Sequence, residues 1–485
     1  MNLPWGDECV TPDTGGVTGI EAGATVSAEN LFVSATILTF SLCWRLSCTV
    51  AFVRFLHPIE PTGYSESHPM VPPKVHAGHR PLPAAIQSAL DSLRVVELTE
   101  ALAGPYCAML LGDLGADVIK VERPGIGDQA RRWGPPYCGT ESAYFLAANR
   151  NKRSIVLDYD DAHGREALER LLARADVFLM NQPNLESLRR RGLDPDTLLT
   201  RFPRLIVCSI TGYGLSGPNA GQAGYDIIAQ AEAGIMSFTG VNGGSPIRYP
   251  VALADLICGI YSATGILAAL LARQRTGYGQ FLDMALFDSQ LTLLANIGSN
   301  YLNAGLLPEK WGNAHPSIVP YQLFQGHDGR FFVVGVATDT LWRSFVSLLG
   351  VENTIGEDAR FATNPLRIQN REALIPALQA VLSGRDAGDW VAELKKAAIP
   401  AALIHRVDEA LTSAQSVARG LIVELEHPLL GAVRNIANPM RMSATPPIYR
   451  LPPPRLGEHT AAILNELGLL PDDPNLAKDG THTSS

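Results

Sequence analysis

From residue 93 onward, short apolar runs alternate with segments of helical periodicity. The apolar runs have the length and β-branched content of buried strands, and they lie at residues 93–98, 117–122, 154–157, 176–180, 205–210 and 280–286. A helix between two such strands lets them pair in parallel through a right-handed crossover. The pattern therefore predicts an α/β fold with a Rossmann-like, mainly parallel sheet.

The pattern changes after residue 305. A hairpin is expected around Asp328-Gly329, and amphipathic helices are expected at 339–349, 371–382 and 387–397. A last helix is expected at 456–468, where a glycine ends it. The predicted organisation is an N-terminal extension, a large α/β domain in two pieces, a small α+β domain and a disordered tail, at residues 1–88, 89–310 plus 430–470, 311–429 and 471–485.

The N-terminal extension does not match a targeting sequence. Residues 1–30 contain no Lys or Arg, whereas signal peptides and mitochondrial presequences are basic. Residues 31–56 are apolar enough for a membrane span, but Arg45 near the middle makes that interpretation costly and disfavoured. We expect a poorly ordered extension and a cytoplasmic protein, with the mitochondrial matrix as the alternative.

Composition excludes several functional classes. The net charge is −9 and no long basic tract occurs, which argues against a nucleic-acid binder but permits a local anion site. The seven cysteines are dispersed and include no C-x-x-C pair, which favours reduced thiols over a disulfide frame or a zinc site. No P-loop, G-x-S-x-G or H-E-x-x-H motif is present, so ATP-driven and common hydrolase chemistries lack support.

The run 125–130 reads Gly-Ile-Gly-Asp-Gln-Ala, which matches a dinucleotide fingerprint. That fingerprint belongs between the first strand and its helix, whereas these glycines follow the second strand. We therefore interpret them as loop glycines.

Asp255 stands where an apolar, strand-like run meets a helix start rich in Gly and Ala. A helix N-terminus stabilises a carboxylate anion, and such an anion in a cleft can attack a carbonyl carbon. The alternative is that Asp255 caps the helix, because Asp is favoured at that position. The local sequence does not choose between these two roles.

Three basic groups follow strand or loop ends: Arg123, the pair at 152–153, and the run at 189–191. Ligands of open α/β sheets bind outside the carboxyl ends of the strands, where an arginine can hold a phosphate. The alternative for each group is an ordinary solvated surface charge.

Many ordered segments between residues 92 and 470 resemble one known family, the class III CoA-transferases. That family includes formyl-CoA transferase, carnitine CoA-transferase and α-methylacyl-CoA racemase. The matching segments are Leu-Ala-Gly-Pro-Tyr at 102–106, Leu-Gly-Ala-Asp-Val-Ile-Lys-Val-Glu-Arg-Pro-Gly at 114–125, Asn-Arg-Asn-Lys-Arg-Ser-Ile at 149–155, Thr-Gly-Tyr-Gly at 211–214, Ala-Gly-Tyr-Asp at 223–226, Leu-Ala-Asp at 253–255, Thr-Gly-Tyr-Gly-Gln at 276–280 and Leu-Gly-Glu-His-Thr at 456–460.

The resemblance implies a catalytic role for Asp255 as the acyl acceptor, which forms an aspartyl-acyl anhydride and then an aspartyl-CoA thioester. It implies coenzyme A esters and carboxylic acids as substrates, no permanently bound cofactor or metal, and an interlocked homodimer. The positions that would bind CoA are Arg123, Leu157, Asn181 and Arg190. The loop after Asn181 departs from the family by one residue, so any of the arginines at 189–191 could fill the last of these positions.

Further substrate contacts are expected at Tyr225 and Asp226. Tyr225 occupies the place of a racemase histidine, and the loss of that base argues against racemisation. Leu102 replaces a glutamine that helps some transferases bind small acyl groups. Two alternatives stay open, an acyl-CoA isomerase and a non-catalytic CoA-binding protein.

Residues 132–142 and 310–322 resemble the branch of the family that acts on dicarboxylic acids. Arg248 lies close before Asp255 in the sequence and is a candidate partner for a second carboxylate, with a surface ion pair as the alternative. The glycine-rich turn at 240–244 is a candidate source of amides for the tetrahedral oxyanions.

Overall fold

The computed structural model describes residues 88–469. The apolar run at 31–56 and the predicted tail lie outside the described residues, as does almost all of the predicted N-terminal extension.

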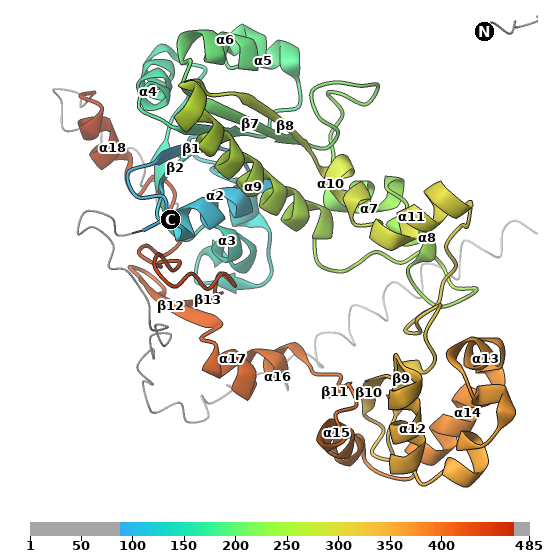
Figure 1. The fold of residues 1–485 in the computed structure, drawn as a ribbon. Coiled ribbons are helices and arrows are strands. Elements are labelled where there is room, and N and C mark those ends of the chain that lie inside the picture. The colour runs from blue at the N-terminus through green and yellow to red at the C-terminus, as the bar shows by residue number, and fades with distance from the viewer. Residues whose placement is uncertain (1–87, 470–485) are drawn as a thin grey trace, which may run out of the picture. The chain divides into compact units, whose positions relative to one another are not determined.

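A six-stranded parallel sheet forms the centre of the larger part of the chain (Figure 1). Its strands are β1 (Arg94–Leu98), β2 (Asp117–Glu122), β5 (Lys152–Val156), β6 (Val177–Met180), β7 (Ile206–Thr211) and β8 (Phe281–Ala285). Their order across the sheet is β5-β2-β1-β6-β7-β8, and each neighbouring pair is parallel. The predicted α/β class, the six strand positions and the parallel pairing are confirmed.

Both faces of the sheet are covered, because alternate strand residues belong to different cores. Val95, Val177 and Cys208 face a core shared with α2 (Ala103–Asp113) and α9 (Leu253–Thr276). Val96 and Phe178 face a second core with α4 (Ala162–Leu172), α5 (Leu185–Arg191), α6 (Pro195–Arg201) and α18 (Thr460–Glu466). Continuous apolar strands of this kind are expected where helices cover both faces.

The strand order changes direction between β1 and β6. The chain first adds β2 and β5 on one side of β1, and then returns to build β6, β7 and β8 on the other side. Ligands of open α/β sheets bind at the carboxyl ends of strands at such a switch point. The fold therefore marks one place for a ligand before any side chain is considered.

The remaining helices of the larger part are short. They are η1 (Gln129–Arg132), α3 (Ala143–Ala148), α7 (Asp226–Glu232), α8 (Ile235–Phe238), α10 (Leu286–Thr292) and α11 (Ala295–Ala304). A small hairpin, β3 (Tyr137–Cys138) with β4 (Glu141–Ser142), precedes α3.

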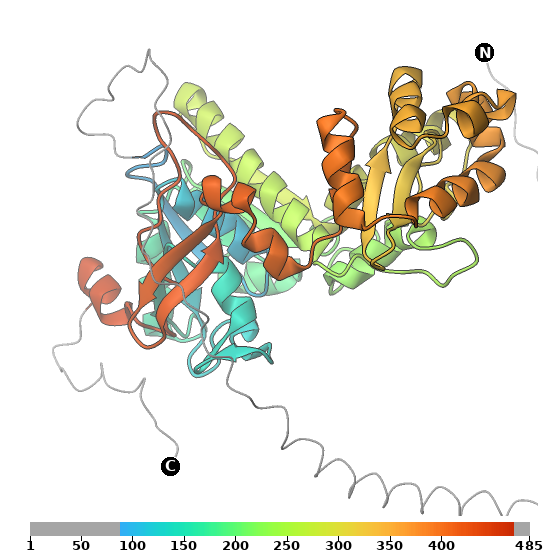
Figure 2. The same cartoon turned by 90° about the horizontal axis from the view of Figure 1, so that it is seen from below.

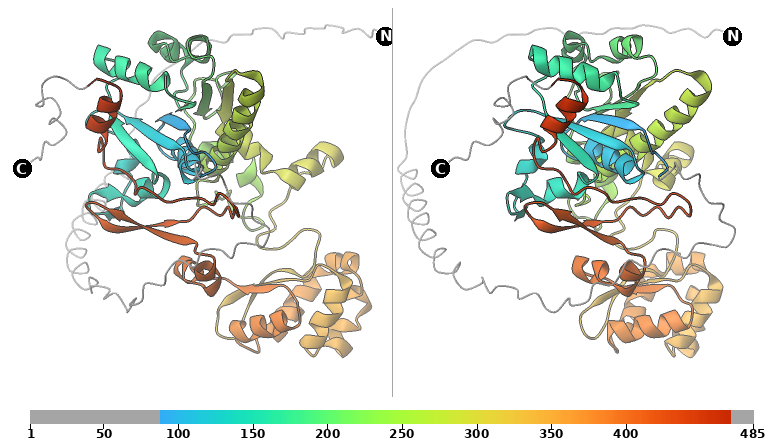
Figure 3. Two further views of the ribbon diagram at one scale, coloured as in Figure 1. Left: turned by 60° about the vertical axis from the view of Figure 1, so that its left-hand side comes forward. Right: turned by 90° about the vertical axis from the view of Figure 1, so that its left-hand side faces the viewer.

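A three-stranded antiparallel sheet lies in the predicted small domain, in gold and orange in Figure 3. Its strands are β9 (Tyr321–Gln325), β10 (Phe331–Gly335) and β11 (Ala401–Leu403). It has its own buried core, which includes Phe332, Trp342 and Leu378. The helices of this segment are α12 (Asp339–Leu348), η2 (Glu352–Gly356), η3 (Ala359–Phe361), α13 (Asn364–Gln369), α14 (Arg371–Leu382) and α15 (Ala387–Lys396). The hairpin at Asp328-Gly329 and the three amphipathic helices are confirmed, while the exact domain boundaries stay predictions.

After α16 (Val407–Leu411) and α17 (Ala414–Ala418), the chain forms a hairpin of β12 (Ile422–His427) and β13 (Gly431–Ile436). Figure 2 shows this hairpin beside α3, where Asn435 donates to the carbonyl of Leu146 at 3.0 Å. Farther along, the amides of Arg450 and Leu451 donate to the Asn151 side chain at 2.7 and 3.2 Å. These contacts return the C-terminal segment to the larger sheet.

The last helix is shorter than predicted. It begins at Thr460 rather than 456, because the preceding residues bond the edge strand β5. Gly457 donates to the Ser154 hydroxyl at 2.8 Å, and the His459 amide donates to the Ser154 carbonyl at 2.9 Å. Backbone that is already bonded to a strand is not available for a helical turn.

Candidate active site

Asp255 lies in the first turn of α9, three residues after the N-cap Ala252. The expected strand-like run before it is not a strand, since residues 246–252 have no regular structure. The helix begins earlier than the sequence suggested, so the capping alternative for Asp255 is wrong. A carboxylate in the first turn still interacts favourably with the helix dipole.

The cap of α9 comes from a different helix. Asp226, the first residue of α7, accepts a hydrogen bond from the amide of Ala254 at 2.9 Å. Its second carboxylate oxygen accepts from the Gln230 side chain at 2.7 Å. Asp226 is buried, and it therefore fixes the start of the helix that carries Asp255. The substrate contact predicted for Asp226 stays a prediction.

Two helix N-termini converge on Asp255. The backbone amide of Ala103, the first residue of α2, donates to its carboxylate. Gly259, one turn after Asp255, allows this approach, because a Cβ there would lie 2.8 Å from the Ala103 carbonyl oxygen. The position next to an amide at a helix start favours the carboxylate anion.

The pKa of Asp255 is nevertheless raised to about 7, first by burial and then by the negative charge of Asp226, while the Ala103 amide acts in the opposite direction. Burial also raises the pKa of Asp226, against the hydrogen bonds from Ala254 and Gln230. Two neighbouring carboxylates whose pKa values are both raised form a reactive arrangement, because perturbed carboxyl groups often mark functional sites.

Tyr144 belongs to the same site, although the sequence did not identify it. Its pKa is raised to about 12 by burial and then by the charges of Asp255 and Asp226. Its ring packs edge-to-face against Trp133, with 5.0 Å between the ring centroids. Its only sequence signal is that it follows the unusual segment 132–142 by two residues.

Arg248 and Tyr225 lie near the carboxylates. The charge of Arg248 acts on Asp226 and opposes the rise in its pKa. Tyr225 is the residue before α7, and 56% of its surface is exposed. Both side chains are thus accessible from solvent and lie near Asp226. Tyr225 is adjacent to Asp226 in the sequence, whereas Arg248 is 22 residues away.

A depression lies at the switch point of the sheet. Its lining includes Glu100 after β1, Arg123 after β2 and Asn181 after β6. The Arg123 side chain donates to the Tyr159 hydroxyl at 3.3 Å, and Asn181 donates to the Glu100 carbonyl at 3.1 Å. Leu157 is buried and is not part of this lining. The structure thus brings together two of the four predicted CoA-binding residues.

Known proteins that resemble this chain belong to one family. A family model described as CoA-transferase family III matches residues 90–460. The chain belongs to this family. It is therefore an enzyme, a CoA-transferase with CoA esters as substrates.

Several characterised relatives share much of the sequence. The succinyl-CoA:glutarate CoA-transferase of Mus musculus is 41% identical over 379 residues, which are 78% of this chain and 86% of that protein. The succinate–glutarate CoA-transferase of Agrobacterium fabrum is 41% identical over 384 residues, 78% of this chain and 95% of that one. These names agree with the resemblance of residues 132–142 and 310–322 to succinate–hydroxymethylglutarate CoA-transferase. The isomerase and non-catalytic alternatives find no support among these relatives.

A solved structure supports the fold. A CAIB/BAIF family protein from Brucella suis has a TM-score of 0.72 and 42% identity, and the match covers 79% of this chain and all (100%) of that chain.

The three arginines at the end of α5 differ in their partners. Arg189 pairs with Glu186 at 2.6 Å, and Arg191 pairs with Asp160 at 2.7 Å. Arg190 is exposed and has no ion pair within the described part of the chain. Of the three arginines, Arg190 can therefore bind a phosphate without breaking an existing ion pair.

The anion-site interpretation of the basic pair at 152–153 is wrong. Lys152 is fully buried, and its ammonium group lies 2.8 Å from Glu97 and donates to Pro105 and Asn149. Arg153 pairs with Asp117 at 2.8 Å. Both cations are already used inside the CoA-transferase fold.

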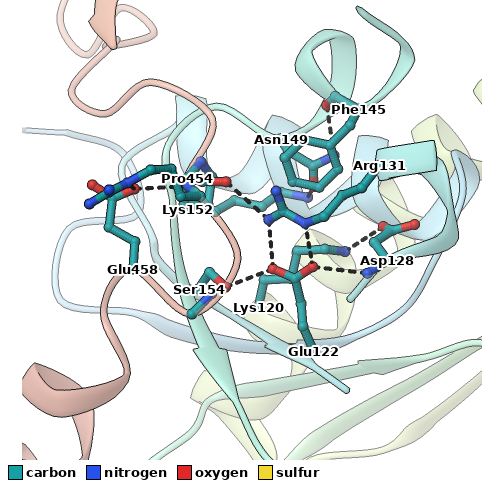
Figure 4. A network of polar contacts seen from close by, with 12 residues as sticks. Lys120, Glu122, Asp128, Arg131, Phe145, Asn149, Lys152, Ser154, Pro454 and Glu458 are labelled. Carbon is teal, nitrogen blue, oxygen red and sulfur yellow. Dashed lines mark hydrogen bonds and ion pairs between the residues drawn. The ribbon is translucent and has the colours of Figure 1, made fainter. Parts of the chain in front are cut away.

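Lys152 is one member of a buried ionic network under the carboxyl ends of β1 and β2. Lys120 lies 2.9 Å from Glu97 and 2.8 Å from Asp128. Figure 4 shows Lys120, Glu122 and Asp128 pointing toward one another, with Arg131 against Glu122. The described residues include no group of three or more His, Cys, Asp or Glu side chains arranged to hold a metal ion.

This network holds the turn that leads into α2. Lys120 donates to the Thr99 carbonyl at 2.8 Å, and the Ala101 amide donates to Asp128 at 3.0 Å. Ala101 has φ of 73°, which is unfavourable for a residue with a Cβ and is maintained only when surrounding contacts fix it. The buried charges therefore set the position of the Ala103 amide that faces Asp255.

Proposed function

We propose that this CoA-transferase moves CoA from succinyl-CoA to a dicarboxylic acid such as glutarate or hydroxymethylglutarate, through covalent intermediates on Asp255. The observation that carries the proposal is the position of Asp255, partly buried beside Asp226 and facing the first amide of α2. The named activities of the relatives from Mus musculus and Agrobacterium fabrum support the choice of acids.

In the first half of the reaction, a carboxylate oxygen of Asp255 attacks the acyl carbon of the donor. The C–S bond breaks, CoA leaves as a thiolate, and a mixed anhydride remains. The thiolate then attacks the aspartyl carbonyl carbon, the anhydride C–O bond breaks, and the donor acid leaves as a carboxylate.

In the second half, the acceptor carboxylate attacks the aspartyl-CoA thioester and releases the thiolate. The thiolate attacks the acyl carbon of the new anhydride, which regenerates the Asp255 carboxylate. One thioester replaces another, and no net proton is gained or lost. This balance explains why neither ATP nor a metal is part of the proposal.

Preorganised amides would stabilise the tetrahedral oxyanions of these steps. The Ala103 amide is a candidate because it already faces the Asp255 carboxylate. The glycine turn at 240–244 stays a second candidate, although the amide of Gly244 is used within its own turn, where it donates to Val241 at 3.0 Å.

The CoA nucleotide would bind at the switch point of the sheet. Arg123 and Asn181 line the depression there, and Arg190, which is exposed and has no ion pair among residues 88–469, would bind a phosphate from α5. Leu157 follows β5 and is buried, so it would support the CoA-binding residues by packing beneath them and not by direct contact with CoA. An arginine at the carboxyl end of a strand suits a phosphate because its charge-assisted hydrogen bonds are strong.

The acceptor acid would place one carboxylate near Asp255 and the other near Arg248. Tyr144 offers a hydroxyl donor at the same site, and Tyr225, which is exposed and immediately precedes Asp226, is a further candidate contact. The distal carboxylate would therefore add a charged contact that a monocarboxylate lacks.

A homodimer in the cytoplasm completes the proposal, with the mitochondrial matrix as the alternative location. Large apolar side chains are exposed on α9, α11 and the segment after α11, namely Ile260, Tyr261, Leu271, Tyr301, Leu302, Leu306 and Leu307. Exposed large apolar side chains are often covered by a partner chain. Light scattering at micromolar concentration should give twice the chain mass, and a stable monomer would contradict the dimer.

The decisive test is a panel of acceptors with succinyl-CoA, read by mass spectrometry of the CoA esters. Glutarate and related diacids should exceed butyrate about tenfold to a hundredfold in kcat/KM, because a charged hydrogen bond contributes about 1.5–3 kcal/mol. Arg248→Ala should reduce this ratio by weakening the diacids alone, while Arg343→Ala, an exposed arginine on α12, should leave it unchanged. Equal use of butyrate by the wild type would disprove the dicarboxylate assignment.

A further inference from the structure

Gln230 is fully buried on α7, one helical turn after Asp226. We propose that Gln230 is a positioning residue that holds the nucleophile's helix and the acceptor-binding segment in one register. The inference rests on the proposed function, because it assigns a specificity role to a residue that touches no substrate.

One side of the Gln230 amide is directed at the nucleophile. Its nitrogen donates to one oxygen of Asp226 at 2.7 Å, and the other oxygen of Asp226 accepts from the Ala254 amide at 2.9 Å. Ala254 immediately precedes Asp255. Only one carboxylate therefore separates Gln230 from the first turn of α9.

The other side of the amide is directed at the segment that carries Arg248. The Gln230 side-chain oxygen accepts from the Tyr249 amide at 2.8 Å, and its nitrogen donates to the Tyr249 carbonyl at 3.2 Å. Residues 246–252 have no regular structure and are largely exposed. Two main-chain bonds from a buried side chain therefore determine the path of this segment beside Asp226.

The chemistry requires an amide at this position. The side chain must accept from one main-chain amide while donating to both a carboxylate and a carbonyl, and a primary amide can do all three. Glutamate keeps the acceptor but loses the donors when ionised, and methionine keeps the volume but loses every hydrogen bond. Because Asp255 and Arg248 would bind the two ends of one acceptor, an error in their spacing should affect turnover of diacids in particular.

The first test is Gln230→Met with glutarate and butyrate as acceptors. We expect kcat with glutarate to fall about tenfold to a hundredfold, as for other small misplacements of reacting groups, and KM for succinyl-CoA to stay within about twofold. The diacid preference over butyrate should shrink in parallel. Gln290→Met is the matched control, because Gln290 is also fully buried but its amide has no hydrogen-bond partner among the described residues.

The second test is the pH profile of Gln230→Glu. An ionised glutamate next to Asp226 should move the acid limb of kcat/KM toward higher pH, because added negative charge disfavours the Asp255 anion. The other groups near the two aspartates are Tyr144, Cys258 and Arg248, and the first two have pKa values raised to about 12 and about 11, so they stay protonated between pH 6 and 9.

The outcomes separate the two proposals. If the wild type does not transfer CoA between dicarboxylates, the proposed function is wrong. If the wild type transfers CoA but Gln230→Met matches Gln290→Met in kcat and in diacid preference, the positioning role is wrong. Should Gln230→Met fail to fold, the glutamate variant decides, and an unshifted acid limb overturns the inference.

Discussion

Two groups of carboxylates in this CoA-transferase respond to burial in opposite ways. Burial would raise the pKa of Glu97 and of Glu122, but neighbouring cations outweigh it, and both pKa values lie below the ordinary value. Burial also raises the pKa of Asp255, and there the neighbouring charge of Asp226 adds to the rise. All three side chains are buried or partly buried carboxyl groups of the larger part of the chain. Glu97 and Glu122 stay ionised at neutral pH, whereas Asp255 titrates near pH 7.

The difference lies in the partners. Glu97 has an ammonium group on each side, at 2.9 and 2.8 Å, and Glu122 has the Arg131 guanidinium at 2.8 Å. Asp255 has a backbone amide and a second carboxylate instead. Counterions keep Glu97 and Glu122 ionised, whereas no cation among the described residues is a main influence on the pKa of Asp255, as the proposed catalytic role requires.

The largest effect is expected from Asp255→Ala. Transfer should fall by at least about 10⁴-fold, the order seen when a covalent nucleophile is removed, because no other group can carry the acyl unit. Binding of CoA, measured by calorimetry, should persist, and hydroxylamine should trap an aspartyl adduct only in the wild type. Asp389→Ala, which removes an exposed aspartate from the first turn of α15, is the matched control. Substantial residual activity in Asp255→Ala would falsify the nucleophile assignment.

The next largest effect is expected from Glu97→Gln, which removes the carboxylate between Lys120 and Lys152. Breaking a buried ion pair on one side costs about 3–5 kcal/mol of unfolding free energy, since an unpaired charge stays buried. The pKa of Lys152 is already lowered to about 8 by burial, so this lysine should lose its proton readily in the variant. The loss in thermal midpoint should therefore be smaller at pH 9 than at pH 7, and a pH-independent loss would contradict the explanation.

A more modest effect concerns pH. Because the pKa of Asp255 is raised to about 7 and its anion is the proposed nucleophile, kcat/KM should fall about tenfold per pH unit below pH 7. Asp226→Asn should move this limb to lower pH by removing the neighbouring charge. Rates measured from pH 5.5 to 8.5 test both statements, and a flat wild-type profile down to pH 5.5 would show that Asp255 is not perturbed.

The smallest effect concerns stability. The folded-state pKa of Asp255 lies above its unfolded value, so the wild type loses stability as pH rises from about 4 to about 7. Asp255→Asn removes this penalty and should raise the unfolding free energy at pH 8 by about 1 kcal/mol, a low figure because the group is partly exposed. The gain should vanish near pH 4, and Asp389→Asn should show no such pH dependence. A gain that is equal at both pH values would indicate a packing effect instead.

The sequence determined the architecture of the larger sheet and the identity of the nucleophile candidate. Apolar periodicity is a local property, so the six strands and most helices were predictable from short windows. Asp255 and Arg123 emerged from local position and from resemblance, whereas Asn181 emerged from resemblance alone. The start of α9 was misplaced, since its cap is supplied by Asp226 in another helix and not by a neighbouring residue.

The tertiary structure alone decided which charges are free and which are used. Lys152 and Arg190 both belong to basic groups that follow predicted strands or loops. Lys152 is buried against Glu97, whereas Arg190 is exposed and has no ion pair in the described residues. Tyr144, Gln230 and the Ala103 amide became visible only when α3, α7 and α2 were placed beside α9. The physical reason is that pKa, hydrogen bonding and burial depend on partners that lie tens of residues away along the chain, and no local pattern records those distances.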